Sequence, residues 1–83
     1  MVYSVYVLIS KKKSKIKTYV GYTNNLKKRL ILHNKGQGAK STRGRTWKVI
    51  YTEKYLTKNE AISREYYIKN NRKFRKLLKK KYS

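Results

Sequence analysis

The sequence contains no cysteine, no proline and no aspartate, and its only acids are Glu53, Glu60 and Glu65. The absence of cysteine excludes a disulfide framework and a thiolate zinc site. A single histidine and three glutamates also exclude most transition-metal cages, which need several side-chain ligands. A metal ion would therefore have to be a hard cation such as Mg²⁺ or Mn²⁺, held by one carboxylate and water.

Long apolar runs are missing as well. No stretch approaches the roughly 18 apolar residues of a membrane span. The first ten residues have no basic segment ahead of their apolar stretch, so they do not read as a secretory signal. These absences predict a protein without membrane contact, located in the cytoplasm and associated with the nucleoid.

Positive charge is abundant. The 83 residues include 24 lysines and arginines, which gives a formal net charge of +21. Such a chain should bind a polyanion through phosphate contacts, with DNA first and RNA as the alternative. Hydrophobic residues make up 39% of the chain, so residues 1–83 should fold as one small domain. On charge alone, a small ribosomal or nucleoid-coating protein is the simpler interpretation.

Two segments of alternating apolar residues, 3–10 and 16–22, flank a polar lysine-rich run and predict an antiparallel hairpin. We expect Ile9 to pair with Ile16, which places Tyr6 opposite Tyr19. Opposed residues lie on the same side of a sheet, so the two phenols should stand side by side. The other face would then carry the aliphatic side chains, namely Val5, Val7, Ile9, Ile16 and Val20.

A helix is expected over residues 26–34, with N-cap candidates in Thr23–Asn25 and Gly36 in a left-handed conformation after its end. Arg29 and His33 are spaced i, i+4 on this helix and can act at one place. Residues 36–45 form a basic, glycine-rich loop that could lie along phosphates or serve as a solvated connector. A third strand is expected over 47–56, and its alternation puts five side chains on one side: Trp47, Val49, Tyr51, Glu53 and Tyr55.

The three glutamates have different expected roles. Thr57 and Glu60 have the spacing of a capping box at the start of a helix over about 58–70. Glu53, near a strand end, reads as an ion-pair partner. Glu65 is the only acid on an apolar helix stripe, where a carboxylate is costly unless a cation or hydrogen bonds compensate its charge. A structural salt bridge to Arg29 or a lysine and a functional role remain equally open. A basic amphipathic helix over 72–81 completes the chain.

The order and spacing of these residues resemble the GIY-YIG nuclease superfamily, most closely its small stand-alone bacterial members, over essentially the whole chain. The resemblance rests on these segments of the sequence: Val5-Tyr6-Val7, Tyr19-Val20-Gly21, Thr23-Asn24-Asn25-Leu26, Lys28-Arg29-Leu30, His33-Asn34, residues 36–45 and Ser63-Arg64-Glu65-Tyr66. Val5 stands where the first motif usually has glycine, and the asparagine that some members place after the glutamate has no clear counterpart.

The resemblance implies an α+β fold in the order β-β-α-β-α-α, with a three-stranded antiparallel sheet flanked by helices. It also implies a metal-dependent endonuclease that hydrolyses DNA phosphodiesters, is selective for DNA structure and acts in repair or recombination. Its site would combine Tyr6, Tyr19, Arg29, His33 and Glu65 on one phosphate. Glu65 would bind one Mg²⁺ or Mn²⁺, since so few acids argue against two metals. A tyrosine, Tyr6 before Tyr19, would be the base, provided that nearby cations favour its ionised form. His33 would relay the proton, orient a tyrosine or only complete a helix end.

Further cations are expected to contact nucleic acid along the loop and the outer helices, namely Lys28, Lys40, Arg43, Arg45, Lys69 and Arg72. One alternative function is a non-catalytic binding module on the same fold, which would need these cations but neither Glu65 nor a metal. Another is a nuclease that stays inactive until a partner protein targets or activates it, because so small a domain offers little surface for reading sequence.

Overall fold

The computed structural model describes residues 2–82 and has the expected element order. Within these residues seven elements follow one another: β1 (Tyr3–Lys12), β2 (Lys15–Thr23), α1 (Leu26–Asn34), the short 3₁₀ helix η1 (Lys40–Thr42), β3 (Lys48–Tyr55), α2 (Lys58–Lys69) and α3 (Arg72–Tyr82). The strands form one antiparallel sheet in the order β2-β1-β3. The α+β prediction is therefore confirmed. None of the helices within residues 2–82 combines the length and the apolar character that a membrane span requires.

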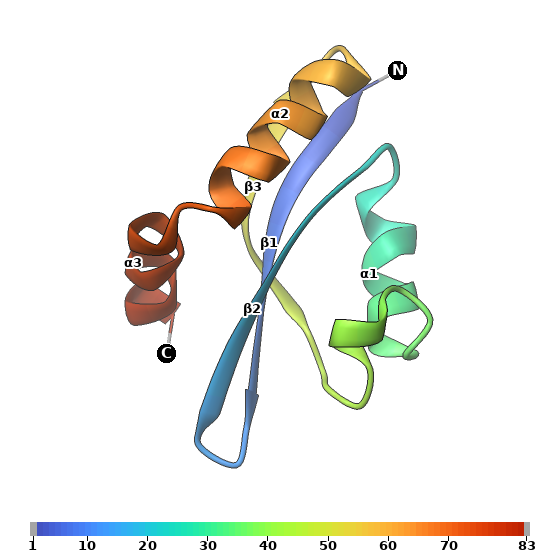
Figure 1. Ribbon diagram of the computed structural model, residues 1–83. Coiled ribbons are helices and arrows are strands. Elements are labelled where there is room, and N and C mark those ends of the chain that lie inside the picture. The colour runs from blue at the N-terminus through green and yellow to red at the C-terminus, as the bar shows by residue number, and fades with distance from the viewer. Residues whose placement is uncertain (1, 83) are drawn as a thin grey trace.

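Helices cover both faces of the sheet. Figure 1 shows α2 and α3 on one side of the strands and α1 with η1 on the other. The buried core of the α2 face is aliphatic, with Val5 and Val7 packed against Ala61 and Ile68, all four fully buried. The α1 face holds a second cluster in which Tyr6, Leu8 and Trp47 pack with partly buried side chains of α1. The buried side chains are thus aliphatic on the α2 face, whereas on the α1 face they include two aromatic rings, those of Tyr6 and Trp47.

The hairpin register differs from the prediction by two residues. Tyr6 lies opposite Gly21, and Tyr19 lies opposite Leu8. The cause is a tight turn in which only Lys13 and Ser14 leave the strands, both with positive φ (49° and 62°). That conformation matches the type I′ turn of two-residue hairpins, whose twist fits the flanking strands. A shift of two residues keeps each side chain on its face, so Tyr6 and Tyr19 still share one.

The prediction that five alternate residues of the third strand share a face is wrong. Pairing to β1 passes from Tyr51 directly to Val49, which leaves Ile50 as the extra residue of a β-bulge. Ile50 is buried in the aliphatic core. The bulge reverses the alternation, so Trp47 and Val49 pack in the α1-face cluster, whereas Tyr51 and Tyr55 pack on the α2 face.

The helix ends follow the predicted caps. Asn25 Oδ1 accepts the amide of Lys28 at 3.1 Å, which caps α1 at its start. Beyond its end, Gly36 has a φ of +78°, and the amides of Gly36 and Gln37 close a Schellman motif on the carbonyls of His33 and Leu32. Thr57 caps α2 and hydrogen-bonds the Glu60 carboxylate at 2.8 Å, which gives Glu60 a structural role.

Glu53 is also occupied, by an arginine and two phenols. Arg64 donates to both carboxylate oxygens, at 2.8 and 2.7 Å, and the hydroxyls of Tyr51 and Tyr55 donate to the same carboxylate. These hydrogen bonds, above all those from Arg64, lower the pKa of Glu53 to about 2 against the opposing effect of burial. The predicted ion-pair role of Glu53 is confirmed, with an arginine of α2 as the partner.

Glu53→Gln should destabilise the fold in a pH-dependent way. The folded pKa of about 2 lies below the ordinary 4.5, so this carboxylate stabilises the fold above pH 4.5 and loses its contribution as the pH falls toward 2. At pH 7 we expect the free energy of unfolding to drop by about 2 kcal/mol, since the amide leaves Arg64 without its charge partner. Urea melts of parent, Glu53→Gln and the exposed control Glu60→Gln at several pH values test this. Equal acid sensitivity of the parent and Glu53→Gln would contradict it.

Candidate active site

A buried histidine and a buried tyrosine face each other across the α1 side of the sheet. The hydroxyl of Tyr6, from β1, lies 2.9 Å from Nε2 of His33, from the last turn of α1. Tyr6 is 1% exposed and His33 is fully buried. A buried imidazole needs a partner for each nitrogen, so the contacts of Nδ1 decide which way the proton lies.

Thr42 supplies that second partner and fixes the tautomer. Its hydroxyl lies 3.0 Å from His33 Nδ1 and donates to the carbonyl of Ala39 at 2.9 Å. A hydroxyl has one hydrogen, so Thr42 must accept the hydrogen of Nδ1. Neutral His33 therefore carries its proton on Nδ1, and its Nε2 lone pair accepts the hydroxyl of Tyr6.

Both groups are neutral near pH 7. Burial raises the pKa of Tyr6 to about 12, partly offset by hydrogen bonding to Arg29. Burial also lowers the pKa of His33, and the charge of Arg29 lowers it further. The expectation that nearby cations favour the ionised phenol is therefore wrong for Tyr6, because burial outweighs the effect of Arg29. Tyr6 cannot act as a preformed phenolate, but it can pass its own proton to His33 while its oxygen accepts another.

Two glycines make this close packing possible. A methyl group at Gly21 would lie 2.6 Å from the Tyr6 hydroxyl oxygen, and one at Gly38 would lie 2.3 Å from His33 Nδ1. Real Cβ atoms do not approach neighbours that closely. Gly21 belongs to the second motif segment and Gly38 to the basic loop, so both segments serve to seat the Tyr6–His33 pair.

Aromatic and amide contacts hold the surrounding frame. The ring of Tyr19 lies 4.8 Å from His33 and 6.3 Å from Tyr6, centroid to centroid. Trp47 donates its ring N–H to the carbonyl of Thr42 at 2.8 Å, and its backbone amide donates to Asn34 Oδ1 at 2.6 Å. The end of α1, the loop and the start of β3 are thereby tied together around His33.

Arg29 stands one turn before His33 on α1 and interacts with both tyrosines. Its pKa is raised mainly by hydrogen bonding to Tyr6, with smaller contributions from Tyr19. Its Nε is buried and has no hydrogen-bond partner within residues 2–82. A buried donor without a partner is costly, and an anion is the ligand that would satisfy it best.

Glu65 lies half-buried on α2 between fully buried Ala61 and Ile68. Across residues 2–82 its carboxylate makes no hydrogen bond or ion pair, so the alternative of a structural salt bridge is not realised. Its charge acts on Tyr6 from across the site and favours the neutral phenol. The same residues contain no group of three or more metal-ligating side chains. A single carboxylate suits a hard cation that keeps most of its water, so the residues fit a divalent metal ion.

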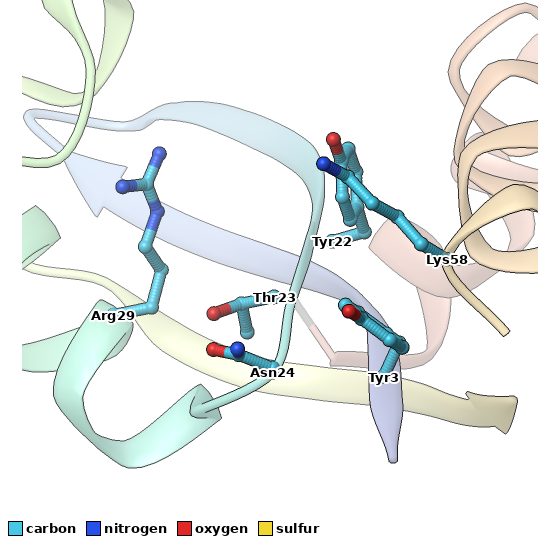
Figure 2. A pocket seen from close by; sticks show the side chains of 6 residues that line it. All are labelled: Tyr3, Tyr22, Thr23, Asn24, Arg29 and Lys58. Atoms are coloured by element: carbon cyan, nitrogen blue, oxygen red, sulfur yellow. The ribbon is translucent and has the colours of Figure 1, made fainter. Parts of the chain in front are cut away.

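A pocket of about 380 Å³ opens beside Arg29, between α1 and the start of α2. Figure 2 shows Arg29 on one side of it and Lys58 and Tyr22 on the other, with Thr23 and Asn24 between them. Lys58 precedes Glu65 by seven residues, so the two lie on the same face of α2. A phosphate placed here would meet two cations. Lys58 was not predicted, because only the packing of α2 reveals which of the many lysines faces Arg29.

The other predicted cations divide into two groups. Five are exposed and available to a ligand: Lys28, Lys40, Arg43, Lys69 and Arg72. Arg45 is half-buried and donates to Ser10 Oγ at 3.1 Å and to the carbonyl of Lys15 at 2.9 Å. It fastens the loop to the hairpin, so its guanidinium is largely committed within the fold.

Thr42→Val should weaken both the fold and any chemistry that depends on the Tyr6–His33 pair. The substitution removes the acceptor of His33 Nδ1–H in a fully buried place, which should cost about 1–3 kcal/mol of stability. It also frees His33 to turn or to change tautomer. Thr42→Ser keeps the hydroxyl and is the matched control. Melting curves and histidine ¹⁵N chemical shifts report the two effects, and an unchanged tautomer in Thr42→Val would contradict the assignment.

Comparisons with known proteins place these features in a wider group. The family model described as "GIY-YIG catalytic domain" matches residues 2–82. The chain is similar to a UPF0213 protein of Oceanobacillus iheyensis, with 47% identity over 74 residues that cover 88% of this chain and 83% of the relative. A UPF0213 protein of Clostridium perfringens is 51% identical over 74 residues, covering 88% and 76%. The solution NMR structure of a UPF0213 protein from Bacillus halodurans has a TM-score of 0.51 at 35% identity, covering 94% of this chain and 82% of that one.

Proposed function

This chain belongs to the GIY-YIG family of nuclease domains, and we propose that it is a metal-dependent endonuclease that hydrolyses DNA phosphodiester bonds. The observation that carries the proposal is the arrangement Thr42–His33–Tyr6 beside an arginine with a buried, unpaired N–H. A binding module would need only exposed cations. A fixed histidine tautomer that accepts from a buried tyrosine is the kind of arrangement that moves protons.

In the proposed reaction Tyr6 receives the proton of the attacking water and gives its own proton to Nε2 of His33. The water oxygen forms a bond to phosphorus, and the bond to the leaving oxygen breaks. Neither Tyr6 nor His33 has to hold a charge before the reaction starts, in agreement with their shifted pKa values. The hydrogen bond from His33 Nδ1–H to Thr42 keeps a proton on Nδ1, so Nε2 is free to accept the proton of Tyr6.

Arg29 would hold the phosphate with its planar guanidinium, aided by Lys58 across the pocket. Tyr19, packed against His33, would line the position of the water or phosphate. Glu65 would hold one Mg²⁺ or Mn²⁺, which when bound stabilises negative charge developing on the phosphate and the leaving oxygen. Five exposed cations would contact the DNA backbone around the site, namely Lys28, Lys40, Arg43, Lys69 and Arg72.

We further propose that the enzyme is selective for DNA structure, works in repair or recombination and acts in the cytoplasm at the nucleoid. A domain this small has little surface for reading sequence, whereas its charge favours phosphate contacts on any sequence. A partner protein could supply targeting or activation, and RNA is the alternative substrate.

The test is a cleavage assay on branched, duplex and single-stranded DNA with Mg²⁺, Mn²⁺ or EDTA. We expect cutting only with a divalent metal and at a higher rate on the branched substrate. Binding of all substrates without cutting under every metal condition would favour the non-catalytic binding module. Cutting in EDTA would contradict the metal requirement.

A further inference from the structure

A second surface, outside the Tyr6–His33 pair and the pocket beside Arg29, lies where α2 ends and α3 begins (Figure 1). It is a groove of about 510 Å³ lined by Tyr66, Tyr67, Asn70, Asn71, Arg72 and Lys73. The two tyrosines are 69% and 53% exposed, although other tyrosines of the chain pack into the two cores. Two adjacent phenol rings are thus presented to solvent among cations.

The ring of Tyr67 is held in place from one side. The guanidinium of Arg64 lies 4.9 Å from the ring centroid. Arg64 is itself fixed by two hydrogen bonds to Glu53, at 2.8 and 2.7 Å, which anchor it to β3. A ring braced on one face loses little freedom when a planar group stacks on its other face, so Tyr67 is prepared for stacking.

Positive charge continues from this groove along α3. Arg72 lines the groove and also a second one of about 340 Å³, shared with Thr18, Arg75, Lys76 and Lys79. The four cations are spaced i, i+3, i+4 and i+7, so they form one row on the helix. Arg75 Nε is buried without a partner within residues 2–82. No acidic residue lines either groove, so no carboxylate there offsets the mutual repulsion of the four cations. A bound polyanion would offset it.

We propose that the groove at Tyr66 and Tyr67, together with the cationic row of α3, binds an unpaired nucleic-acid strand. Its bases would stack on the two tyrosines, and its phosphates would follow the row that begins at Arg72. Aromatic rings next to a cationic track are the usual means of holding single strands, because every base has a flat face to stack. Bases inside a duplex are not free to reach the rings. The inference rests on the proposed function and deepens it, because it names an unpaired strand as the structural feature of the substrate.

Binding measured in EDTA, without cleavage, tests this binding site alone. The probes are a fluorescent oligothymidylate of about 15 nucleotides, an abasic strand of equal length and a matching duplex. Tyr66→Leu/Tyr67→Leu should bind oligothymidylate at least about tenfold more weakly than the parent and bind duplex unchanged. The control is Tyr82→Leu, since Tyr82 is another exposed tyrosine beside a lysine but lies outside the groove. It should behave like the parent.

The abasic strand separates stacking from charge, because it keeps the phosphates and lacks the bases. The parent should bind it about as weakly as the double variant binds oligothymidylate. Equal affinity of the parent for abasic and thymidylate strands, or an equal loss on duplex and single strand, would overturn the proposal. Tyr66→Phe/Tyr67→Phe retains stacking and should bind like the parent. If metal-dependent cleavage is absent while these differences hold, the proposed function fails and the strand-binding site stands.

Discussion

Glu65→Gln should reduce metal-dependent cleavage by about a thousandfold or more, because several kcal/mol of transition-state stabilisation depend on the cation it would hold. The amide keeps the volume of the side chain between Ala61 and Ile68 on α2 and removes only the charge. Since Glu65 makes no hydrogen bond or ion pair within residues 2–82, the fold should lose no contact. Affinity for DNA should stay equal or rise slightly, because a negative charge near a phosphate has gone.

The comparison with Glu60→Gln makes this result specific. That variant changes the net charge by the same amount on the same helix, but Glu60 is an exposed capping residue. Single-turnover cleavage at saturating Mn²⁺ and thermal melts should be measured for both variants. Calorimetric titration with Mn²⁺ in the presence of an uncleavable DNA should show the metal lost only from Glu65→Gln. If Glu65→Gln cuts like the parent, the single-metal nuclease is the wrong account and the binding module is the better one.

The alternation of side chains between the two faces of a strand explains why much of the site could be predicted although the predicted hairpin register was wrong. Tyr6 and Tyr19 belong to different strands of one hairpin, so any shift by an even number of residues leaves them on one face. The helical spacing of Arg29 and His33 is similarly insensitive to where α1 ends. The tight turn itself carried no signal, because Lys13 and Ser14 are not the residues usually found with positive φ.

Other features depend on tertiary packing and left no local pattern. The bulge at Ile50 lets Trp47 pack on the α1 face and Tyr51 pack on the α2 face, on opposite sides of the sheet. Thr42 sits in a segment that reads as a solvated loop, and it becomes a partner of His33 only because Gly38 lets the loop come close. A short polar residue between glycines and cations is too common to indicate such a contact.

Arg29→Ala should slow cleavage by about 100- to 1000-fold, the usual effect of removing one positioned donor to a developing negative charge. DNA affinity should change far less, because many of the 24 lysines and arginines remain to hold the backbone. The charge of Arg29 also lowers the pKa of His33. Removing this charge should raise the pKa of His33. Because His33 has to be neutral to accept the proton of Tyr6, the acid limb of the pH–rate profile should then move to higher pH.

Lys28→Ala is the matched control for Arg29→Ala, since it removes one positive charge from the neighbouring, exposed position of α1. It should weaken binding slightly and leave both the single-turnover rate and the pH profile unchanged. Arg29→Lys separates charge from geometry: a retained charge should keep the acid limb near that of the parent, whereas the lost guanidinium fork should still slow cleavage. If Arg29→Ala loses binding and cleavage rate equally, Arg29 is an ordinary phosphate contact. If the acid limb also stays in place, the charge of Arg29 has no effect on the Tyr6–His33 pair during the reaction.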